Sequence, residues 1–104
     1  MANDSLIMQG MKRVFFVLLL TLSSCATHPP AQEMSDARSA IKTAQALPGD
    51  ETRADKYLQS AEKALEDAAA AIKLQRYDYA RSKAMEAKRN AQQAARLKQS
   101  QGNN

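Results

Sequence analysis

The stretch YDYARSKAMEAKRNAQQAARLK, residues 77–98, decides the fold of this chain. Alanine recurs in it at steps of four and three residues, at positions 80, 84, 87, 91 and 94. Because steps that average about 3.5 residues place side chains along one line of a helix, the pattern predicts a helix that packs on a partner through an alanine seam. We expect Asp78 as the N-cap, Leu97 as the residue that closes the seam, and Lys98 as the approximate end.

The partner seam lies earlier in the chain and has the same steps. Its predicted members are Ala54, Leu58, Ala61, Leu65, Ala68 and Ile72. Thr52 and Asp55 resemble a capping box at the start of this second helix, and Asp50 is a rival cap. A turn near residues 75–77 would bring the two seams face to face, and their small side chains would let the helices approach more closely than the usual distance of about 8–10 Å.

A shorter helix is expected before this hairpin, at residues 34–47. Its apolar positions recur at three and four residues: Met34, Ala37, Ile41, Ala44 and Leu47. Ser35 is its predicted N-cap, and Pro48 with Gly49 should stop it. The predicted fold class is therefore all-α, with a short N-terminal helix followed by an antiparallel, alanine-rich two-helix hairpin. Three tyrosines should plug the ends of this fold, with their hydroxyls reaching water, namely Tyr57, Tyr77 and Tyr79.

Length and composition limit the chemistry that the chain can perform. With 104 residues it is at most one small domain, and a single Cys and a single His exclude an internal disulfide, a Cys-based zinc site and a His-pair metal site. No catalytic set is recognisable, so we expect neither an enzyme nor a bound metal or cofactor. Large apolar residues are few after residue 25, which predicts marginal stability or self-association.

The N-terminus has the composition of an export signal. Lys12 and Arg13 precede the apolar run VFFVLLLTL at residues 14–22, which is too short to cross about 30 Å of hydrocarbon as a helix. A basic start and a short apolar run predict a cleavable signal helix. Met11 stands directly before the basic pair, so translation from Met1 or from Met11 stays open.

The four residues that follow the apolar core, Leu22-Ser23-Ser24-Cys25, resemble the lipobox of bacterial lipoprotein precursors. The resemblance implies a diacylglyceryl group on the sulfur of Cys25, cleavage before Cys25, and acylation of the new amino terminus, with palmitate as a typical chain. Ala26 stands where aspartate would favour the inner membrane, which implies sorting to the outer membrane, facing the periplasm. Two or more acyl chains hold a protein stably on a membrane, whereas one binds only marginally.

These features divide the chain into four segments. The signal peptide covers residues 1–24, and the lipidated Cys25 with its tether covers residues 25–33. His28, Pro29 and Pro30 lie in this tether, where consecutive prolines favour an extended chain. The helical domain covers residues 34–98, and residues 99–104 should form a disordered tail.

Residues 30–98 resemble the small helical domain catalogued as domain of unknown function 4398. The resemblance is carried by EMSDARSAI at residues 33–41, YDYAR at residues 77–81, and the alanine pattern that follows. It implies a helical domain of bacterial envelope lipoproteins and supplies no activity. The Tyr-x-x-Ala-Arg run also resembles tetratricopeptide helical pairs, although Gln75 and Arg76 replace the usual Gly-Asp before that tyrosine. Glycine is the residue that best tolerates a positive φ at such a turn.

The charge of the chain is uneven, with a formal total of +4. From residue 79 onward six cations face a single carboxylate, Glu86: they are Arg81, Lys83, Lys88, Arg89, Arg96 and Lys98. This pattern fits either a solvated helix face or a surface for anionic polymers and lipid headgroups. Nucleic acid is disfavoured as a partner because the protein is predicted to be exported.

Two functions therefore remain. The first is a lipid-anchored, periplasm-facing envelope lipoprotein whose small helical module has a structural or interaction role, with a protein of the envelope or the cell wall as partner. The alternative is a weak binder of anionic envelope polymer or lipid headgroups through the basic third helix.

Overall fold

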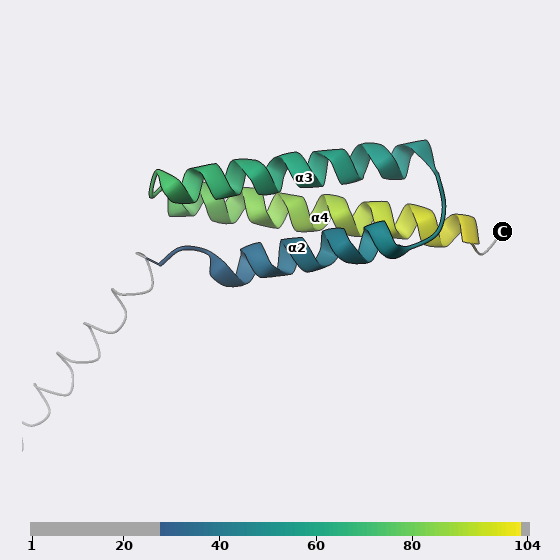
Figure 1. Ribbon diagram of the computed structural model, residues 1–104, viewed down its shortest axis with the longest axis horizontal. Coiled ribbons are helices and arrows are strands. Elements are labelled where there is room, and N and C mark those ends of the chain that lie inside the picture. Colours follow the sequence, from purple (N-terminus) through teal and green to yellow (C-terminus); the bar gives the residue numbers. More distant parts are fainter. Residues whose placement is uncertain (1–27, 103–104) are drawn as a thin grey trace, which may run out of the picture.

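The computed structural model describes residues 28–102, which form three α-helices and no strand. Helix α2 spans Ala31–Ala46, α3 spans Thr52–Lys73 and α4 spans Tyr77–Gly102 (Figure 1). The predicted all-α class, with a short helix before a helical hairpin, is confirmed. The predicted signal helix, the lipobox and Ala26 lie outside the described residues.

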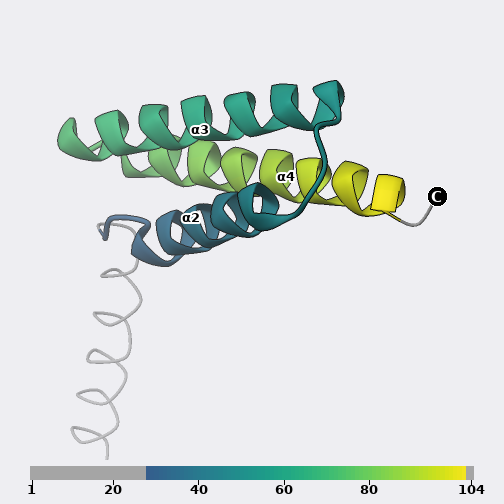
Figure 2. The same cartoon turned by 45° about the vertical axis from the view of Figure 1, so that its right-hand side comes forward.

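Helix α4 lies between the other two helices in both views of the bundle (Figures 1 and 2). The hairpin of α3 and α4 is antiparallel, whereas α2 runs in the same direction as α4. The contacts between α2 and α4 show this direction: Glu33 meets Arg81 near the two helix starts, and Ala44 meets Lys98 near the two ends. Helix α2 is therefore a third wall of the core, a role that its sequence pattern alone did not predict.

The alanine seam of α4 is confirmed, because all five of its alanines have no exposed surface. Ala84 packs in one cluster with Met34 of α2 and Ala68 of α3. Ala87 packs in the same way with Ala37 and Ala64. Each of these alanines thus contacts both neighbouring helices, so a single seam serves two partners.

The buried face of α3 differs from the predicted one at two positions. Ala64 and Ala71 are buried, whereas Leu65 and Ile72 are only partly buried. The close approach of the helices leaves room for a methyl group at the contact, so the larger side chains lie beside it. Leu65 covers the flank of all three clusters of buried residues, which explains why an apolar pattern alone placed it in the seam.

Helix α2 begins three residues before the predicted domain boundary. It starts at Ala31, directly after Pro30, so Ser35 lies inside the helix and is not its N-cap. The amide of Met34 donates to the carbonyl of Pro30 at 3.0 Å, which closes the first turn. The first N–H groups of a helix have no partner within it. Proline has no N–H, so it suits a position at the helix start. The chain stops being helical before Pro48, as predicted.

The caps of the two longer helices also differ from the predictions. Glu51 caps α3, because its Oε1 accepts from the amide of Arg53 at 3.2 Å, so neither Thr52 nor Asp50 is the cap. Helix α4 begins at Tyr77, which puts Asp78 in its first turn instead of at the cap. Its other end continues through Gly102, so residues 99–102 are helical and not a disordered tail.

The turn between α3 and α4 is tight although it contains no glycine. Arg76 N donates to Ala71 O at 2.9 Å, and Gln75 N donates to Ile72 O at 3.0 Å. These two bonds form a Schellman motif, whose C′ residue takes a left-handed conformation that glycine usually supplies. Gln75 adopts it with φ 59°. The replacement of glycine by Gln75 is therefore accommodated in the turn as local backbone strain.

The tyrosines take different positions from one another. Tyr57 is partly buried against the main cluster of the core, and Tyr77 is partly buried at the start of α4. Tyr79 is 51% exposed, so the prediction that it plugs an end of the bundle is wrong. It lies one residue before Ala80 of the seam, and successive residues of a helix face different directions.

Candidate functional site

The predicted basic face of α4 is broken up by carboxylates, two of which come from α2. Arg81 is held between two of these carboxylates: its Nε lies 3.3 Å from Oε1 of Glu33, and its Nη1 lies 3.3 Å from Oδ1 of Asp78. Lys88 Nζ lies 3.8 Å from Oδ2 of Asp36. The local sequence of α4 did not reveal these α2 partners, because residues 33 and 36 meet α4 only after the chain has folded back twice.

Lys83 also pairs with side chains of the bundle. Its Nζ lies 3.0 Å from Oε2 of Glu86 and 5.7 Å from the ring centre of Tyr79. The hydrogen bond to Glu86, followed by the negative charge of that carboxylate, raises the pKa of Lys83 above its ordinary value. The charge of Lys83 is thus partly neutralised within α4 itself.

Lys98 is the clearest departure from the predicted surface site. Its side chain is buried, with 7% of the residue exposed, and its Nζ donates to the carbonyls of Ala44 at 2.9 Å and Leu47 at 3.3 Å. The carbonyl of Ala44 would bond to the amide of residue 48 in a continuing helix, but Pro48 has none. Lys98 supplies the missing donor and places its cation at the negative end of α2.

Lys98 therefore closes the seam in place of Leu97, and it is not available to an anionic surface. Leu97 is partly buried beside the main cluster. The burial of Lys98 was not predicted, because the sequence does not show which backbone carbonyls of another helix lack a hydrogen-bond donor.

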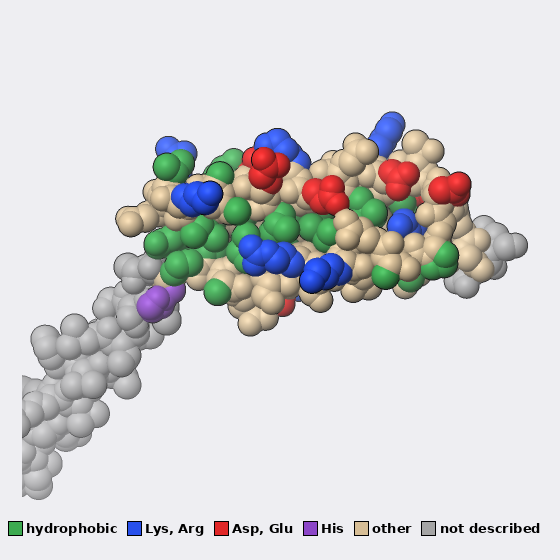
Figure 3. All heavy atoms as spheres, viewed as in Figure 1, with side chains coloured by type: hydrophobic (Ala, Val, Ile, Leu, Met, Phe, Trp, Pro, Cys, Tyr) green, Lys and Arg blue, Asp and Glu red, His purple; other side chains and the backbone are tan. Residues whose placement is uncertain are grey.

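Only two of the six cations remain exposed without an ion pair among residues 28–102, and they are Arg89 and Arg96. Arg96 donates from Nη1 to Oε1 of Gln93 at 3.2 Å. On the face drawn in Figure 3, basic and acidic side chains are both spread along the bundle, with hydrophobic side chains between them. The six predicted residues thus do not form one continuous basic surface.

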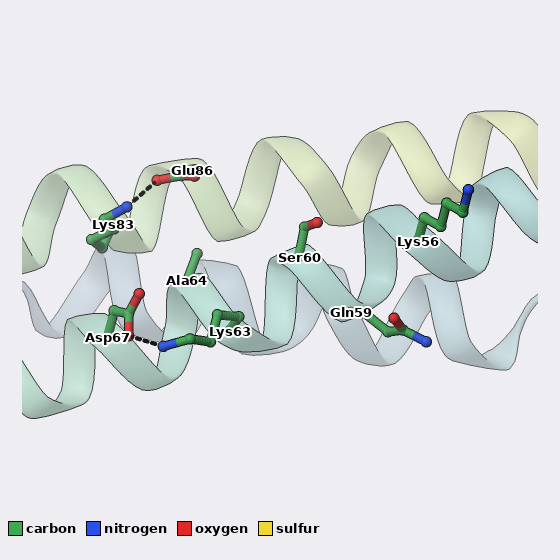
Figure 4. A pocket seen from close by; sticks show the side chains of 8 residues that line it. All are labelled: Lys56, Gln59, Ser60, Lys63, Ala64, Asp67, Lys83 and Glu86. Carbon is green, nitrogen blue, oxygen red and sulfur yellow. Dashed lines mark hydrogen bonds and ion pairs between the residues drawn. The ribbon is translucent and has the colours of Figure 1, made fainter.

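A shallow groove of about 550 Å³ runs between α3 and α4. It is lined by Lys56, Gln59, Ser60, Lys63, Ala64, Asp67, Lys83 and Glu86 (Figure 4). Within it Lys63 Nζ lies 2.6 Å from Oδ1 of Asp67, and this hydrogen bond, followed by the charge of Asp67, raises the pKa of Lys63. Two of the three lysines that line the groove are therefore already paired with carboxylates.

The described residues show neither a metal-binding cluster nor a membrane span. No group of three or more His, Cys, Asp or Glu side chains among residues 28–102 could hold a metal ion. None of the three described helices is long and apolar enough to cross a bilayer. His28 lies exposed at the start of the described chain.

The remaining predicted site residues, Leu22, Ser23, Ser24, Cys25 and Ala26, lie outside the described residues. Comparison with known proteins gives no match: no family model, no curated protein and no solved structure matches this chain. The resemblances to lipoprotein precursors and to the helical domain of unknown function 4398 therefore stay predictions from the residues that carry them.

Proposed function

We propose that this protein is a lipid-anchored lipoprotein of the bacterial envelope, facing the periplasm from the outer membrane, whose three-helix bundle is a structural or interaction module. The observation that carries the proposal is the lipobox-like run Leu22-Ser23-Ser24-Cys25 directly after a basic start and a short apolar segment. The absence of aspartate after Cys25 supports the outer membrane as the destination.

The start of the bundle supports an anchored arrangement. Pro30, the residue before α2, has a fully buried side chain, so the chain is packed against the bundle from that point. Cys25 precedes Pro30 by five residues. Because an extended chain spans at most about 3.6 Å per residue, a lipid on Cys25 would hold the start of the bundle within about 18 Å of the anchored sulfur.

The surface of the bundle favours the docking of a protein over the binding of an anionic polymer. Four of the six predicted basic residues are paired with carboxylates or carbonyls of the bundle, as described above, which leaves Arg89 and Arg96. Cations that are scattered and partly neutralised attract an anionic polymer less strongly than a continuous basic surface would. We therefore carry forward the interaction module, with a protein of the envelope or a second copy of the chain as partner.

The test is metabolic labelling of cells with radioactive palmitate, followed by separation of membrane and soluble fractions. The parent protein should carry the label and sediment with membranes, and Cys25→Ala should carry none, because the thiol is the group that is lipidated. A matched control is the double variant C25A/S60C, which restores a thiol at an exposed position of α3 and should stay unlabelled. Palmitate on C25A, or none on the parent, would contradict the anchor.

The interaction role is tested in the same cells by chemical cross-linking and mass spectrometry. A specific cross-linked partner, or a cross-linked dimer, that disappears in C25A would support a module that works at the membrane. Cross-links that are unchanged in C25A would contradict that part of the proposal, because they would show that the bundle finds its partner without the anchor.

A further inference from the structure

The large hydrophobic side chains that the bundle leaves exposed are gathered in one part of it. Within residues 28–102 these are Leu74, 68% exposed, Tyr79, 51% exposed, and Met85, 45% exposed. Leu74 directly follows α3, and Tyr79 lies in the first turn of α4. Met85 lies eight residues after the start of α4, which is about 12 Å along the helix at about 1.5 Å per residue. All three are therefore near the turn that joins α3 to α4.

The tether reaches the bundle at the same end. Glu33, two residues after the start of α2, lies 3.3 Å from Arg81 in the first turns of α4, so the start of α2 and the α3–α4 turn are neighbours. Figure 1 shows the start of α2 and the α3–α4 turn at one end of the bundle and the C-terminus at the other. On the face drawn in Figure 3, hydrophobic side chains lie at that same end of the bundle.

The turn at this end also carries exposed positive charge. Lys73 and Arg76 flank Leu74 and Gln75, are exposed, and have no ion pair among the described residues. The nearby carboxylate of Asp78 is exposed and shares Arg81 with Glu33, so Lys73, Arg76 and Arg81 together exceed these two carboxylates by one positive charge. By contrast, the connection between α2 and α3 carries the two carboxylates of Asp50 and Glu51.

We propose that the tip formed by Lys73, Leu74, Arg76 and Tyr79 docks on the anionic lipid surface to which Cys25 is anchored. This inference rests on the proposed function, because the anchor brings the tip to the membrane. Leu74 enters the interface between headgroups and acyl chains, and the ring of Tyr79 lies at headgroup level, where its apolar body and polar hydroxyl are both satisfied. Lys73 and Arg76 meet lipid phosphates, to which basic residues near a membrane surface are attracted.

Because the tether is short, a surface of only a few side chains is sufficient for docking on the membrane. A few exposed side chains bind a membrane weakly when the protein is free in solution. An anchor within about 18 Å converts this binding into an intramolecular event with a high effective concentration. The docked tip would hold the bundle upright on the membrane and present the opposite end, with Asp50, Glu51 and the end of α4, to the periplasm.

The chain contains no tryptophan, so one introduced tryptophan reports on its own surroundings. The reporter variant is Leu74→Trp, and its matched control is Gln99→Trp, at an exposed position toward the other end of α4. Each lipidated protein is purified from cell membranes, and mass spectrometry verifies the lipid on Cys25. The proteins are then placed in vesicles of phosphatidylethanolamine and phosphatidylglycerol, with or without brominated acyl chains that quench nearby tryptophan.

We expect L74W to emit at shorter wavelength in vesicles than a water-exposed tryptophan does, and to lose most of its fluorescence to brominated lipid. Q99W should show neither effect. Adding K73Q and R76Q to L74W should reduce the quenching, with the helix content unchanged by circular dichroism.

Equal quenching of L74W and Q99W on verified lipoprotein would overturn the docked tip and leave the anchor standing. Quenching of L74W that is unaffected by K73Q and R76Q would overturn the role of the anionic lipid. A protein without lipid on Cys25 would overturn the proposed function, and the docked tip with it.

Discussion

The buried ammonium of Lys98 should be worth more to the bundle than any surface lysine, and Lys98→Met tests this. Methionine keeps an unbranched stem of similar length, so the packing along the seam is largely preserved. What the variant loses is the donor to Ala44 at 2.9 Å and to Leu47 at 3.3 Å. The carbonyl of Ala44 then has no donor, because Pro48 cannot replace Lys98.

The size of the effect follows from these two bonds. A hydrogen bond from a charged donor contributes about 1.5–3 kcal/mol, and the bond to Ala44 is the buried one. The longer bond to Leu47 is only partly buried, so water can replace much of it. Removing the ammonium also removes the cost of its own desolvation, which offsets part of the loss. We therefore expect Lys98→Met to lower the free energy of unfolding by about 1–3 kcal/mol.

The assay is thermal and urea unfolding followed by far-ultraviolet circular dichroism. For a domain of this size, each kcal/mol corresponds to roughly 4–8 °C in Tm. The matched control is Lys42→Met, which removes one exposed cation of α2 that has no ion pair among the described residues. The control should stay within about 0.5 kcal/mol of the parent. If both variants unfold at the same temperature, the capping role assigned to Lys98 is refuted.

Two further predictions concern the seam and the turn. Ala84→Leu should overpack the junction with Met34 and Ala68 and destabilise the bundle by about 1–3 kcal/mol. The control Ser82→Leu, at an exposed position of the same helix, should have little effect, and equal melting temperatures of the two variants would count against a close alanine seam. Gln75→Gly should raise the free energy of unfolding by about 1 kcal/mol, because glycine adopts the φ of 59° without a Cβ clash. Gln75→Ala should give no such gain, and thermal unfolding that finds the glycine variant no more stable than the alanine variant would argue against strain at this turn.

The sequence by itself determined the helices and the main seam. Pro48 and Gly49 break the chain after α2, and the steps of four and three residues put all five alanines of α4 inside. These features are local, because helix periodicity and proline geometry act within a few residues. The predicted ends were less accurate, since a cap depends on one side chain reaching one amide, as Glu51 does where Thr52 and Asp50 were expected.

Only the tertiary structure decided which residues were available as a site. Arg81, Lys88 and Lys98 look alike in the sequence of α4, yet each is engaged by α2, through Glu33, Asp36 and the carbonyl of Ala44. These partners are about 50 residues away along the chain, and no periodicity in α4 records them. The tip at Leu74 and Tyr79 became visible for the same reason: a side chain's exposure, and its distance from the start of α2, are set by how the helices pack.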